Sequence, residues 1–303
     1  VLYAVDWNSV FDFSLMEPHV DQYIIMGYAY YYQGSSSTGP CDPLYQFGTT
    51  NNINVLRFDK LRSKTAIKEF IKLKVDLLVM AYVTDIVPME IINNPNKGTI
   101  QYHPSLLPKH RGPSSINWAI INGDNSTGIT IFWPDEGLDT GPILMQKKVH
   151  ISPDDTTGTL YFNKLFPIGV ESMIDSIKLV ISNKAPKIIQ DEKKSTYESW
   201  CSKKEIDWDK DPDEIYNLIR GCDPQPGAWT KIESKTVSLY NCNIEENNNI
   251  NINKSFIIEN KKVSVGLKNK KITLGRIKDE KGKKVNAFEW FEENNFTNNS
   301  KLG

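Results

Sequence analysis

The apolar run VDLLVMAY, at residues 75–82, constrains the fold of this chain more than any other feature. It is hydrophobic at every position except Asp76, and such runs are typical of strands that are buried on both faces of a sheet. A segment with helical apolar spacing precedes it at 63–74, and the strand-like segment GTIQYH follows at 98–103. This alternation of helix and strand predicts an α/β domain with a mostly parallel sheet.

The rest of the first 199 residues fits the same kind of domain. Further elements are expected as strands at 1–7, 23–32, 53–58, 127–133 and 143–151, and as helices at 115–122 and 155–182. A polar segment around Pro186, residues 184–194, then ends the last helical pattern. We interpret this segment as a linker, so the first domain is predicted over residues 1–199.

The chain changes character beyond residue 200. One helix is expected at 212–219, after which short strands recur at a regular spacing that is typical of a small β-barrel or sandwich. Seven of the thirteen residues 241–253 are Asn, which indicates a mobile loop insertion. Residues 292–303 are expected to form a flexible tail. The sequence therefore predicts a second, β-rich domain over residues 200–303.

Composition excludes several classes of protein. Hydrophobic residues make up 39% of the chain and include 7 Trp, 13 Tyr and 12 Phe, which is enough for a sizeable core and excludes a wholly disordered chain. No run approaches the roughly 18 uninterrupted apolar residues of a membrane-spanning helix. The 36 basic and 37 acidic residues leave a formal charge of −1, so the molecule as a whole is no polyanion binder.

The spacing and number of the cysteines and histidines indicate neither a metal site nor disulfide bonds. No two of the 4 cysteines share a CxxC spacing and there are only 4 His, so we expect neither a zinc site nor a disulfide framework. The N-terminus lacks a basic region followed by an apolar one, and a cytoplasmic protein is expected. Because the first residue is Val rather than Met, the chain is expected to be a processed form or a fragment.

The segment QYHPSLLPKHRG, residues 101–112, holds the first candidate site residues. Gln101 and His103 point to the same face because side chains alternate along a strand. Pro104 ends the strand and keeps His103 extended. An amide and an imidazole therefore lie together at the carboxyl end of a strand, which is where α/β sheets bind ligands.

Asp139, in the loop EGLDTG, is the second candidate. The glycines on either side allow the backbone to approach a ligand closely. Taken alone, His103 could be a structural histidine and Asp139 a turn residue. Together they fit acyl transfer, in which the imidazole stabilises an oxyanion and the carboxylate accepts a proton. The stretch around His103 has no GxSxG elbow with a nucleophile, which favours direct attack on an acyl group without a covalent intermediate.

The pattern HPSLLPKHRGPSSINWAI, followed 36 residues after its first His by the Asp of GLDTG, resembles the folate-dependent formyltransferase superfamily. Further matching segments are Ile206–Trp208, Ile219–Gly221 and Pro226–Thr230, and the resemblance covers residues 41–291. It is strongest to the hydrolase domain with which the 10-formyltetrahydrofolate dehydrogenases begin. The resemblance implies a Rossmann-like, mostly parallel sheet in a catalytic domain, followed by a smaller, OB-like β-barrel domain.

The resemblance also implies roles for individual residues. His103 falls on the family's catalytic His, and Asp139 falls on its essential Asp, which also contacts the substrate. Gln101 stands where transferase members carry an Asn, so its amide is expected to help hold the oxyanion. The loop that contacts the pterin end of folate falls on Asp85, Ile86 and Val87.

The reaction that the resemblance implies is cleavage of 10-formyltetrahydrofolate to tetrahydrofolate and formate, by attack of water on the N10-formyl carbon. The alternative is formyl transfer to an amine, on methionyl-tRNA or on an amino sugar. A third hypothesis is a folate-binding or regulatory protein that has lost turnover. The formyl donor is the only cofactor expected, with no metal and no nicotinamide site. Carrier and aldehyde dehydrogenase domains are expected as partners if the chain is a fragment.

The basic stretch Lys254–Lys284 bears on the tRNA alternative. It contains eleven basic and three acidic residues, a composition that a tRNA-binding surface would have. Aromatic residues that could stack on bases are sparse there, and several of the charges fall in predicted hairpin turns. We therefore favour the solvated outer face of a small β domain over a tRNA site.

Overall fold

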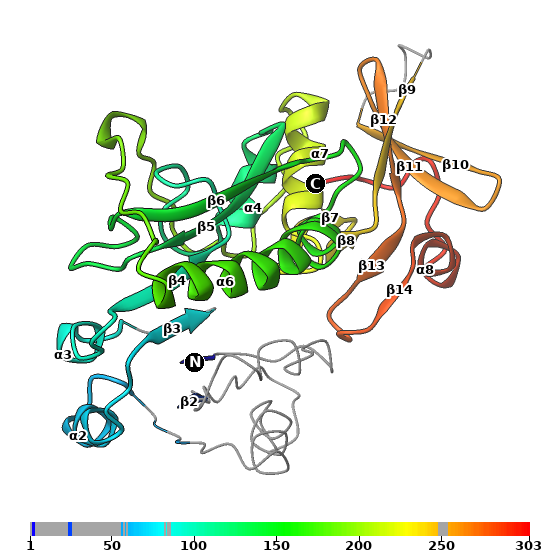
Figure 1. The fold of residues 1–303 in the computed structure, drawn as a ribbon. Coiled ribbons are helices and arrows are strands. Elements are labelled where there is room, and N and C mark those ends of the chain that lie inside the picture. Colours follow the sequence, from blue (N-terminus) through cyan, green and yellow to red (C-terminus); the bar gives the residue numbers. More distant parts are fainter. Residues whose placement is uncertain are drawn as a thin grey trace. The chain divides into compact units, whose positions relative to one another are not determined.

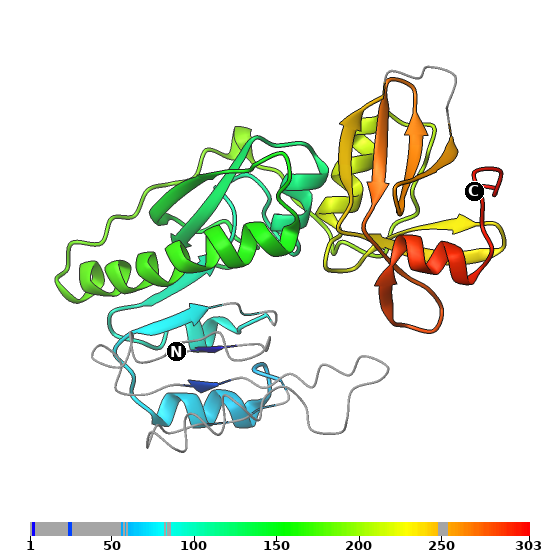
Figure 2. The same cartoon turned by 90° about the vertical axis from the view of Figure 1, so that its right-hand side faces the viewer.

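The computed structural model describes residues 60–81, 86–247 and 254–303, together with residues 56, 58 and 83 and two short N-terminal strands (Figures 1 and 2). Contacts between residues divide the chain into two compact units. The first comprises Val1–Arg111, Gly128–Lys148 and Pro167–Tyr197, and the second comprises Gly112–Thr127, Val149–Phe166 and Glu198–Gly303. The domain boundary expected at residue 199 stays a prediction.

Six strands form the sheet of the first unit, in the order β2-β1-β3-β4-β5-β6 (Figure 1). Their bounds are β1 Leu2–Tyr3, β2 Ile24–Ile25, β3 Leu78–Ala81, β4 Thr99–His103, β5 Ser126–Phe132 and β6 Ile143–His150. Strands β2, β1, β3 and β4 pair in parallel, and β5 runs antiparallel to β4. The α/β class is therefore confirmed, with a mixed sheet. The rest of the strands expected at 1–7 and 23–32 lies outside the described residues.

The strand β3 is buried, as its composition predicts. Residues 78–80 are each at most 3% exposed. Helix α2 (Lys64–Lys72) packs its buried Phe70 into the same apolar cluster, and the single-turn helix α3 (Met89–Ile92) adds Ile91. The pattern predicts α2 but not α3, because one turn is too short to show a helical repeat.

One face of β4 is covered by α6 (Phe166–Ile181), the long green helix in Figure 1. Tyr102 of β4 faces this helix, since a Cβ atom at Gly169 of α6 would lie 2.7 Å from the Tyr102 ring. Because side chains alternate along a strand, Gln101 and His103 lie on the opposite face of the sheet. The two candidate residues of β4 thus face away from α6.

The helices expected at 115–122 and 155–182 are both present. The first is α4 (Ser115–Ile121), and the second has three consecutive parts, α5 (Thr157–Leu160), a π-helical turn (Tyr161–Leu165) and α6. Pro167 has no N–H to donate and its ring crowds the preceding turn, so a wider turn directly before it accommodates the chain. Among the described residues, no helix has both the length and the hydropathy needed to cross a bilayer.

The second unit contains two antiparallel sheets of four strands, ordered β10-β11-β12-β9 and β14-β13-β8-β7. The strands are β7 Ala228–Ile232, β8 Lys235–Tyr240, β9 Asn243–Glu246, β10 Ser255–Glu259, β11 Lys262–Leu267, β12 Lys270–Leu274, β13 Arg276–Lys278 and β14 Lys284–Asn286. Helices α7 (Pro212–Gly221) and α8 (Ala287–Glu293) accompany these strands. The β-rich C-terminal part predicted from the sequence is confirmed.

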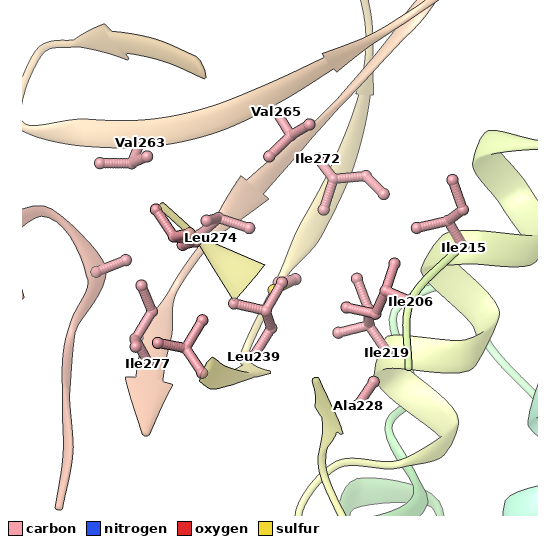
Figure 3. Close-up of a cluster of buried hydrophobic side chains, with 14 of the residues drawn as sticks. Ile206, Ile215, Ile219, Ala228, Leu239, Val263, Val265, Ile272, Leu274 and Ile277 are labelled. Carbon is pink, nitrogen blue, oxygen red and sulfur yellow. The ribbon is translucent and has the colours of Figure 1, made fainter. Parts of the chain in front are cut away.

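A large apolar core lies between the sheets and helices of the β-rich part of this unit. Figure 3 shows side chains from α7, from β8 and from the β11–β13 strands converging on it, among them Ile215, Leu239, Val265 and Ile277. Two of the three aromatic rings of α8, those of Trp290 and Phe291, are buried in the same core. The unit therefore has a hydrophobic core of its own.

Two expectations for the second unit need correction. Residues 292–303 do not form a flexible tail, because Glu292 and Glu293 belong to α8, Leu302 pairs with Ile232 of β7, and Gly303 exchanges backbone hydrogen bonds with Lys231. Part of the Asn-rich segment is ordered as β9, which pairs with β12, while residues 248–253 lie outside the described residues. In both cases long-range strand pairing overrides a locally polar composition, since backbone groups pair whatever the side chains are.

Candidate active site

His103 lies at the carboxyl end of β4, and its side chain is 7% exposed. Its Nδ1 is 3.5 Å from Oδ2 of Asp139, whose side chain is equally buried. Its Nε2 lies 2.8 Å from the carbonyl oxygen of His110. The structure thus brings into contact the two residues that the sequence predicts to act as a pair.

The hydrogen bonds of His103 restrict where protons lie in this pair. A carbonyl oxygen only accepts, so Nε2 of His103 carries a proton. In the neutral imidazole, Nδ1 then has no proton. Its lone pair faces the Asp139 carboxylate, and the two acceptors repel each other. The contact is favourable when one further proton lies on Nδ1 or on the carboxyl group. The pair can therefore hold one proton, as an acid–base catalyst must.

The loop that carries Asp139, residues 134–142, is organised by a second aspartate. Asp135 Oδ1 accepts hydrogen bonds from the backbone N–H of Gly137, at 3.1 Å, and from the hydroxyl of Thr140. Asp139 itself has φ 56°, in the left-handed region that residues other than glycine rarely adopt. The loop therefore holds the catalytic candidate in an unusual backbone conformation, which is common at functional sites.

The two glycines of this loop make room for the loop itself. A Cβ atom at Gly137 would lie 2.1 Å from the hydroxyl oxygen of Thr140, and one at Gly141 would lie 1.8 Å from the carbonyl oxygen of Trp133. The glycines thus have a role inside the loop, and close approach of the backbone to a ligand stays a prediction. The glycines let the loop close on itself, and this closure holds Asp139 against His103.

The chain that follows β4 turns so that the carbonyl of His110 meets the ring of His103. The hydroxyl of Ser105 donates to the carbonyl oxygen of Lys109 at 2.6 Å and closes the turn. The backbone N–H of His110 donates to the hydroxyl oxygen of Thr196 at 2.8 Å. The acceptor for His103 Nε2 is therefore fixed from both sides.

The polar segment at residues 184–194, interpreted from the sequence as a linker, is not one. Most of it belongs to residues 186–197, the return segment, which is hydrogen-bonded to the rest of the first unit. Ile188 and Ile143 of β6 exchange backbone hydrogen bonds of 2.7 and 2.9 Å. Gln190 is only 5% exposed, and it contacts the loop of Asp139. Sequence reasoning missed this segment because its partners are far away along the chain, while its Pro and Lys residues have the composition of a linker.

Arg111 connects the return segment to the end of the turn after β4. Its side chain has no exposed surface, and it donates to both carboxylate oxygens of Glu192, at 2.8 and 2.6 Å, and to the hydroxyl of Tyr197 at 2.7 Å. The carboxylate of Glu192 raises the pKa of Arg111, and the guanidinium in turn lowers the pKa of Glu192. A buried guanidinium needs such partners, because removing an unpaired charge from water is costly.

The remaining predicted site residues have different surroundings. Gln101 is partly exposed, and its amide makes no hydrogen bond to the residues that the structure describes. Ile86 is 74% exposed, whereas Val87 is buried in the apolar cluster that contains Phe70. Asp85 lies outside the described residues. Contact of these three loop residues with a substrate stays a prediction.

Both parts of the chain match the profile of a known family. The profile of the formyl transferase family matches residues 41–177, and the profile of the formyl transferase C-terminal domain matches residues 202–295. The first match contains His103 and Asp139. The second contains all of α7 and the eight strands β7–β14.

Curated relatives include both dehydrogenases and a transferase. The chain is 42% identical over 211 residues to the cytosolic 10-formyltetrahydrofolate dehydrogenase of Pongo abelii, and 37% identical over 269 residues to the mitochondrial 10-formyltetrahydrofolate dehydrogenase of Homo sapiens. These matches cover 67% and 84% of this chain but 23% and 29% of those proteins, so the chain spans about a quarter of their length. It is also 36% identical to the methionyl-tRNA formyltransferase of Acetivibrio thermocellus, over 68% of each chain.

Solved structures with a similar fold agree with these matches. HypX from Aquifex aeolicus, in complex with tetrahydrofolic acid, has a TM-score of 0.63 at 20% identity, covering 82% of this chain and 44% of that one. An N-formyltransferase from Helicobacter canadensis, in complex with folinic acid and dTDP-3-aminofucose, also has a TM-score of 0.63, at 21% identity, covering 86% of this chain and 92% of that one. The predicted fold class is thus confirmed, and the chain belongs to the formyl transferase family of enzymes.

Proposed function

We propose that this chain cleaves 10-formyltetrahydrofolate to tetrahydrofolate and formate, by attack of water on the N10-formyl carbon. The observation that carries the proposal is the buried contact between His103 and Asp139 at the end of β4. An imidazole and a carboxyl group that hold one proton between them fit acyl transfer. The dehydrogenases that the chain resembles carry this folate in their names, which supports the choice of substrate.

In this mechanism Asp139 acts on the nucleophile. As a carboxylate it accepts a proton from water while the water oxygen forms a bond to the formyl carbon. The carbonyl oxygen becomes the oxyanion of a tetrahedral intermediate. It receives a hydrogen bond from Nδ1–H of His103, in the form in which the further proton lies on the imidazole, because Nε2–H already donates to the carbonyl of His110. The bond between carbon and N10 then breaks, and the proton taken from water passes to N10. The products are tetrahydrofolate and formic acid, which ionises to formate.

The contribution of His103 depends on its being oriented before the substrate binds. Its Nε2–H donates to the carbonyl of His110, and the ring is almost fully buried, so it needs no reorganisation during the reaction. Preorganised donors to an oxyanion typically contribute about 3–4 kcal/mol each to stabilisation of the transition state. The partly exposed amide of Gln101, on the same face of β4, is a second donor for the same oxygen.

Formyl transfer to an amine is the second candidate function. The observation that favours it is the Gln101 amide, which stands where the resemblance places a transferase Asn and makes no hydrogen bond within the described part of the chain. The similarity to a methionyl-tRNA formyltransferase supports the same idea. In this reaction an amine replaces water, and Asp139 accepts the proton of the amine instead.

One experiment separates these functions. The purified chain is incubated with 10-formyltetrahydrofolate alone, then with charged initiator tRNA or with an amino sugar nucleotide, and tetrahydrofolate and formate are followed over time. The same incubation without protein measures background hydrolysis, and the Asp139→Asn variant measures the activity that remains without the carboxylate. We expect both products without an acceptor, at a rate well above that of the variant. Release that needs an acceptor would instead support transfer, and binding without release under any condition would indicate a folate-binding protein.

A further inference from the structure

The side chain of Gln190, in the return segment, uses its entire hydrogen-bonding capacity inside the first unit. Its Nε2 donates to the carbonyl oxygens of Asp139, at 2.9 Å, and of Gly141, at 2.7 Å. Its Oε1 accepts from Nη2 of Arg111, at 2.8 Å, and from Nε of Arg111, at 3.2 Å. A primary amide has two N–H donors and two acceptor lone pairs, so all four are engaged.

The two donated bonds restrain the backbone on both sides of Thr140. Asp139 has φ 56°, a conformation that a residue with a side chain adopts only when its surroundings impose it. The carbonyls of Asp139 and Gly141 are held by one rigid, planar group, so neither peptide can rotate without breaking a buried hydrogen bond. Gln190 therefore helps to impose the conformation that directs the Asp139 carboxylate toward His103.

The two accepted bonds connect this loop to the other half of the pair. Arg111 directly follows His110, whose carbonyl oxygen accepts the hydrogen bond of His103 Nε2. The Arg111 guanidinium is itself fixed by Glu192 and Tyr197. A single amide thus links the segment that orients the imidazole to the segment that orients the carboxylate.

We propose that Gln190 is a positioning residue, which sets the distance and orientation of the Asp139 carboxylate relative to the His103 imidazole. This inference rests on the proposed function. A displacement of about 1 Å at a reacting group can cost roughly 10²-fold in rate, so the position of the loop affects the chemical step more than substrate binding. Neither the family profile nor the sequence pattern marks Gln190, and only the tertiary contacts identify it.

Two substitutions test separate parts of this role. Gln190→Glu keeps a nearly isosteric side chain and an acceptor for Arg111, but it loses both donors to the loop. Gln190→Met keeps the length and loses every hydrogen bond. We expect each variant to lower kcat by about 10- to 100-fold while KM for 10-formyltetrahydrofolate changes less than about threefold. A loss that falls on KM alone, or an unchanged kcat in Gln190→Glu, would overturn the proposal.

A matched control separates positioning from general stability. Asn117 of the second unit also donates from one amide to two carbonyls, those of Gly221, at 2.7 Å, and Gln225, at 3.0 Å. Asn117→Leu should therefore lower the melting temperature to a similar degree while kcat stays within about twofold of wild type. If Asn117→Leu lowers kcat as much as the Gln190 variants do, the Gln190 effect is one of stability and the proposal is wrong.

The combination with Asp139→Asn provides the decisive comparison. If Gln190 acts through the Asp139 carboxylate, adding Gln190→Glu to Asp139→Asn should cost less than about twofold in single-turnover rate. If Gln190→Glu lowers the rate by the same factor in wild type and in Asp139→Asn, the proposal is contradicted.

A structural measurement distinguishes failure of this inference from failure of the proposed function. Hydrogen exchange of the backbone amides in residues 134–142 should be faster in both Gln190 variants than in wild type, and unchanged in Asn117→Leu. This result is expected whether or not the chain releases tetrahydrofolate. If the wild-type protein shows no turnover but the variants show this exchange pattern, the proposed function is wrong, while the link between Gln190 and the loop of Asp139 is supported. Unchanged exchange would overturn the link itself.

Discussion

At the scale of single residues, the proposed chemistry depends on the one proton that His103 and Asp139 can hold between them. The carbonyl of His110 determines which imidazole nitrogen is protonated, and the left-handed backbone of Asp139 determines where the carboxylate points. In the proposed mechanism these two constraints preorganise the groups that respond to charge in the transition state, which is how electrostatic stabilisation is most effective.

His103→Ala and Asp139→Ala should each remove nearly all turnover, by about 10²–10⁴-fold, because both groups act on charge and protons that appear in the transition state. Affinity for the folate should stay within about tenfold of wild type. Steady-state kinetics and equilibrium binding of tetrahydrofolate measure the two effects. His150→Ala, at the exposed end of β6, is a control that should keep wild-type kinetics. A variant of His103 or Asp139 that keeps more than about a tenth of the rate contradicts its assigned role.

Gln101 allows a test of acceptor choice. If its amide donates to the oxyanion, Gln101→Leu should lower kcat by roughly 10²–10³, with little change in folate affinity. Gln101→Asn shortens the amide to that found in transferases, and we expect formyl transfer to an amine to appear while hydrolysis is unchanged or reduced. Both activities are measured on the same preparation by following formate and the formylated amine. If neither variant differs from wild type, Gln101 takes no part in catalysis.

At the scale of elements, local sequence signals mark where some of the helices begin. Helix α7 is an example, since Asp211 accepts a hydrogen bond from the N–H of Asp213, at 2.9 Å, and Pro212 occupies the first turn, where no donor is needed. Such signals lie within a few residues of each other, so the sequence predicts them. The shortest elements, such as α3 and β14, have no repeat to detect, and packing determines them.

The N-cap of α7 provides a stability test. Asp211→Ala should lower the free energy of unfolding by about 1 kcal/mol, because the first turn loses its side-chain acceptor. Denaturation in urea, followed by circular dichroism, measures this change. Glu214→Ala, an exposed residue of the same turn whose carboxylate is 3.9 Å from Lys210, should change stability by less than about 0.5 kcal/mol. Equal losses in both variants would show that the cap contributes nothing specific.

The turn after α7 predicts a dependence of stability on pH. Burial raises the pKa of Asp223, whose Oδ2 accepts a hydrogen bond from the N–H of Asn241 at 2.8 Å. The folded chain therefore keeps a proton that the unfolded chain loses near its usual pKa of about 3.9, so the contribution of Asp223 to stability falls as pH rises from there to the raised pKa. In the Asp223→Asn variant, the amide that replaces this carboxyl group does not titrate.

The stability of Asp223→Asn relative to wild type should accordingly increase through this pH window and become constant above it. Urea denaturation of both proteins at a series of pH values from about 4 upward measures the difference. A difference that is independent of pH, or one that decreases, contradicts the raised pKa.

At the scale of the whole molecule, charge argues against tRNA as a partner. The formal charge is −1, and at least three of the ten lysines in the basic stretch form ion pairs with acidic residues of the second unit. Lys254 pairs with Asp209, Lys270 with Asp213 at 2.7 Å, and Lys271 with Glu245 at 3.5 Å. Paired lysines attract phosphates less, because their field is partly cancelled.

We therefore expect binding to tRNA only in the non-specific range, with a dissociation constant of roughly 10⁻⁴–10⁻⁶ M at physiological salt. Fluorescence anisotropy of labelled tRNA over a series of salt concentrations measures it. A variant with Asp209→Asn, Asp213→Asn and Glu245→Gln releases the three lysines and should bind more tightly. Nanomolar binding by the wild-type chain would instead support formyl transfer to tRNA.

The sequence by itself determined the α/β class, the β-rich second part, and the placement of Gln101 and His103 on one face of a strand. These features depend on periodicity and on Pro and Gly, which act between near neighbours. Only the tertiary structure decided that the return segment is packed through Gln190 against the loop of Asp139 and is not a linker. Gln190 bonds to Arg111, 79 residues away, and to Asp139, 51 residues away. A polar side chain looks the same in a sequence whether water or a buried loop satisfies it, and only folding determines which partner it meets.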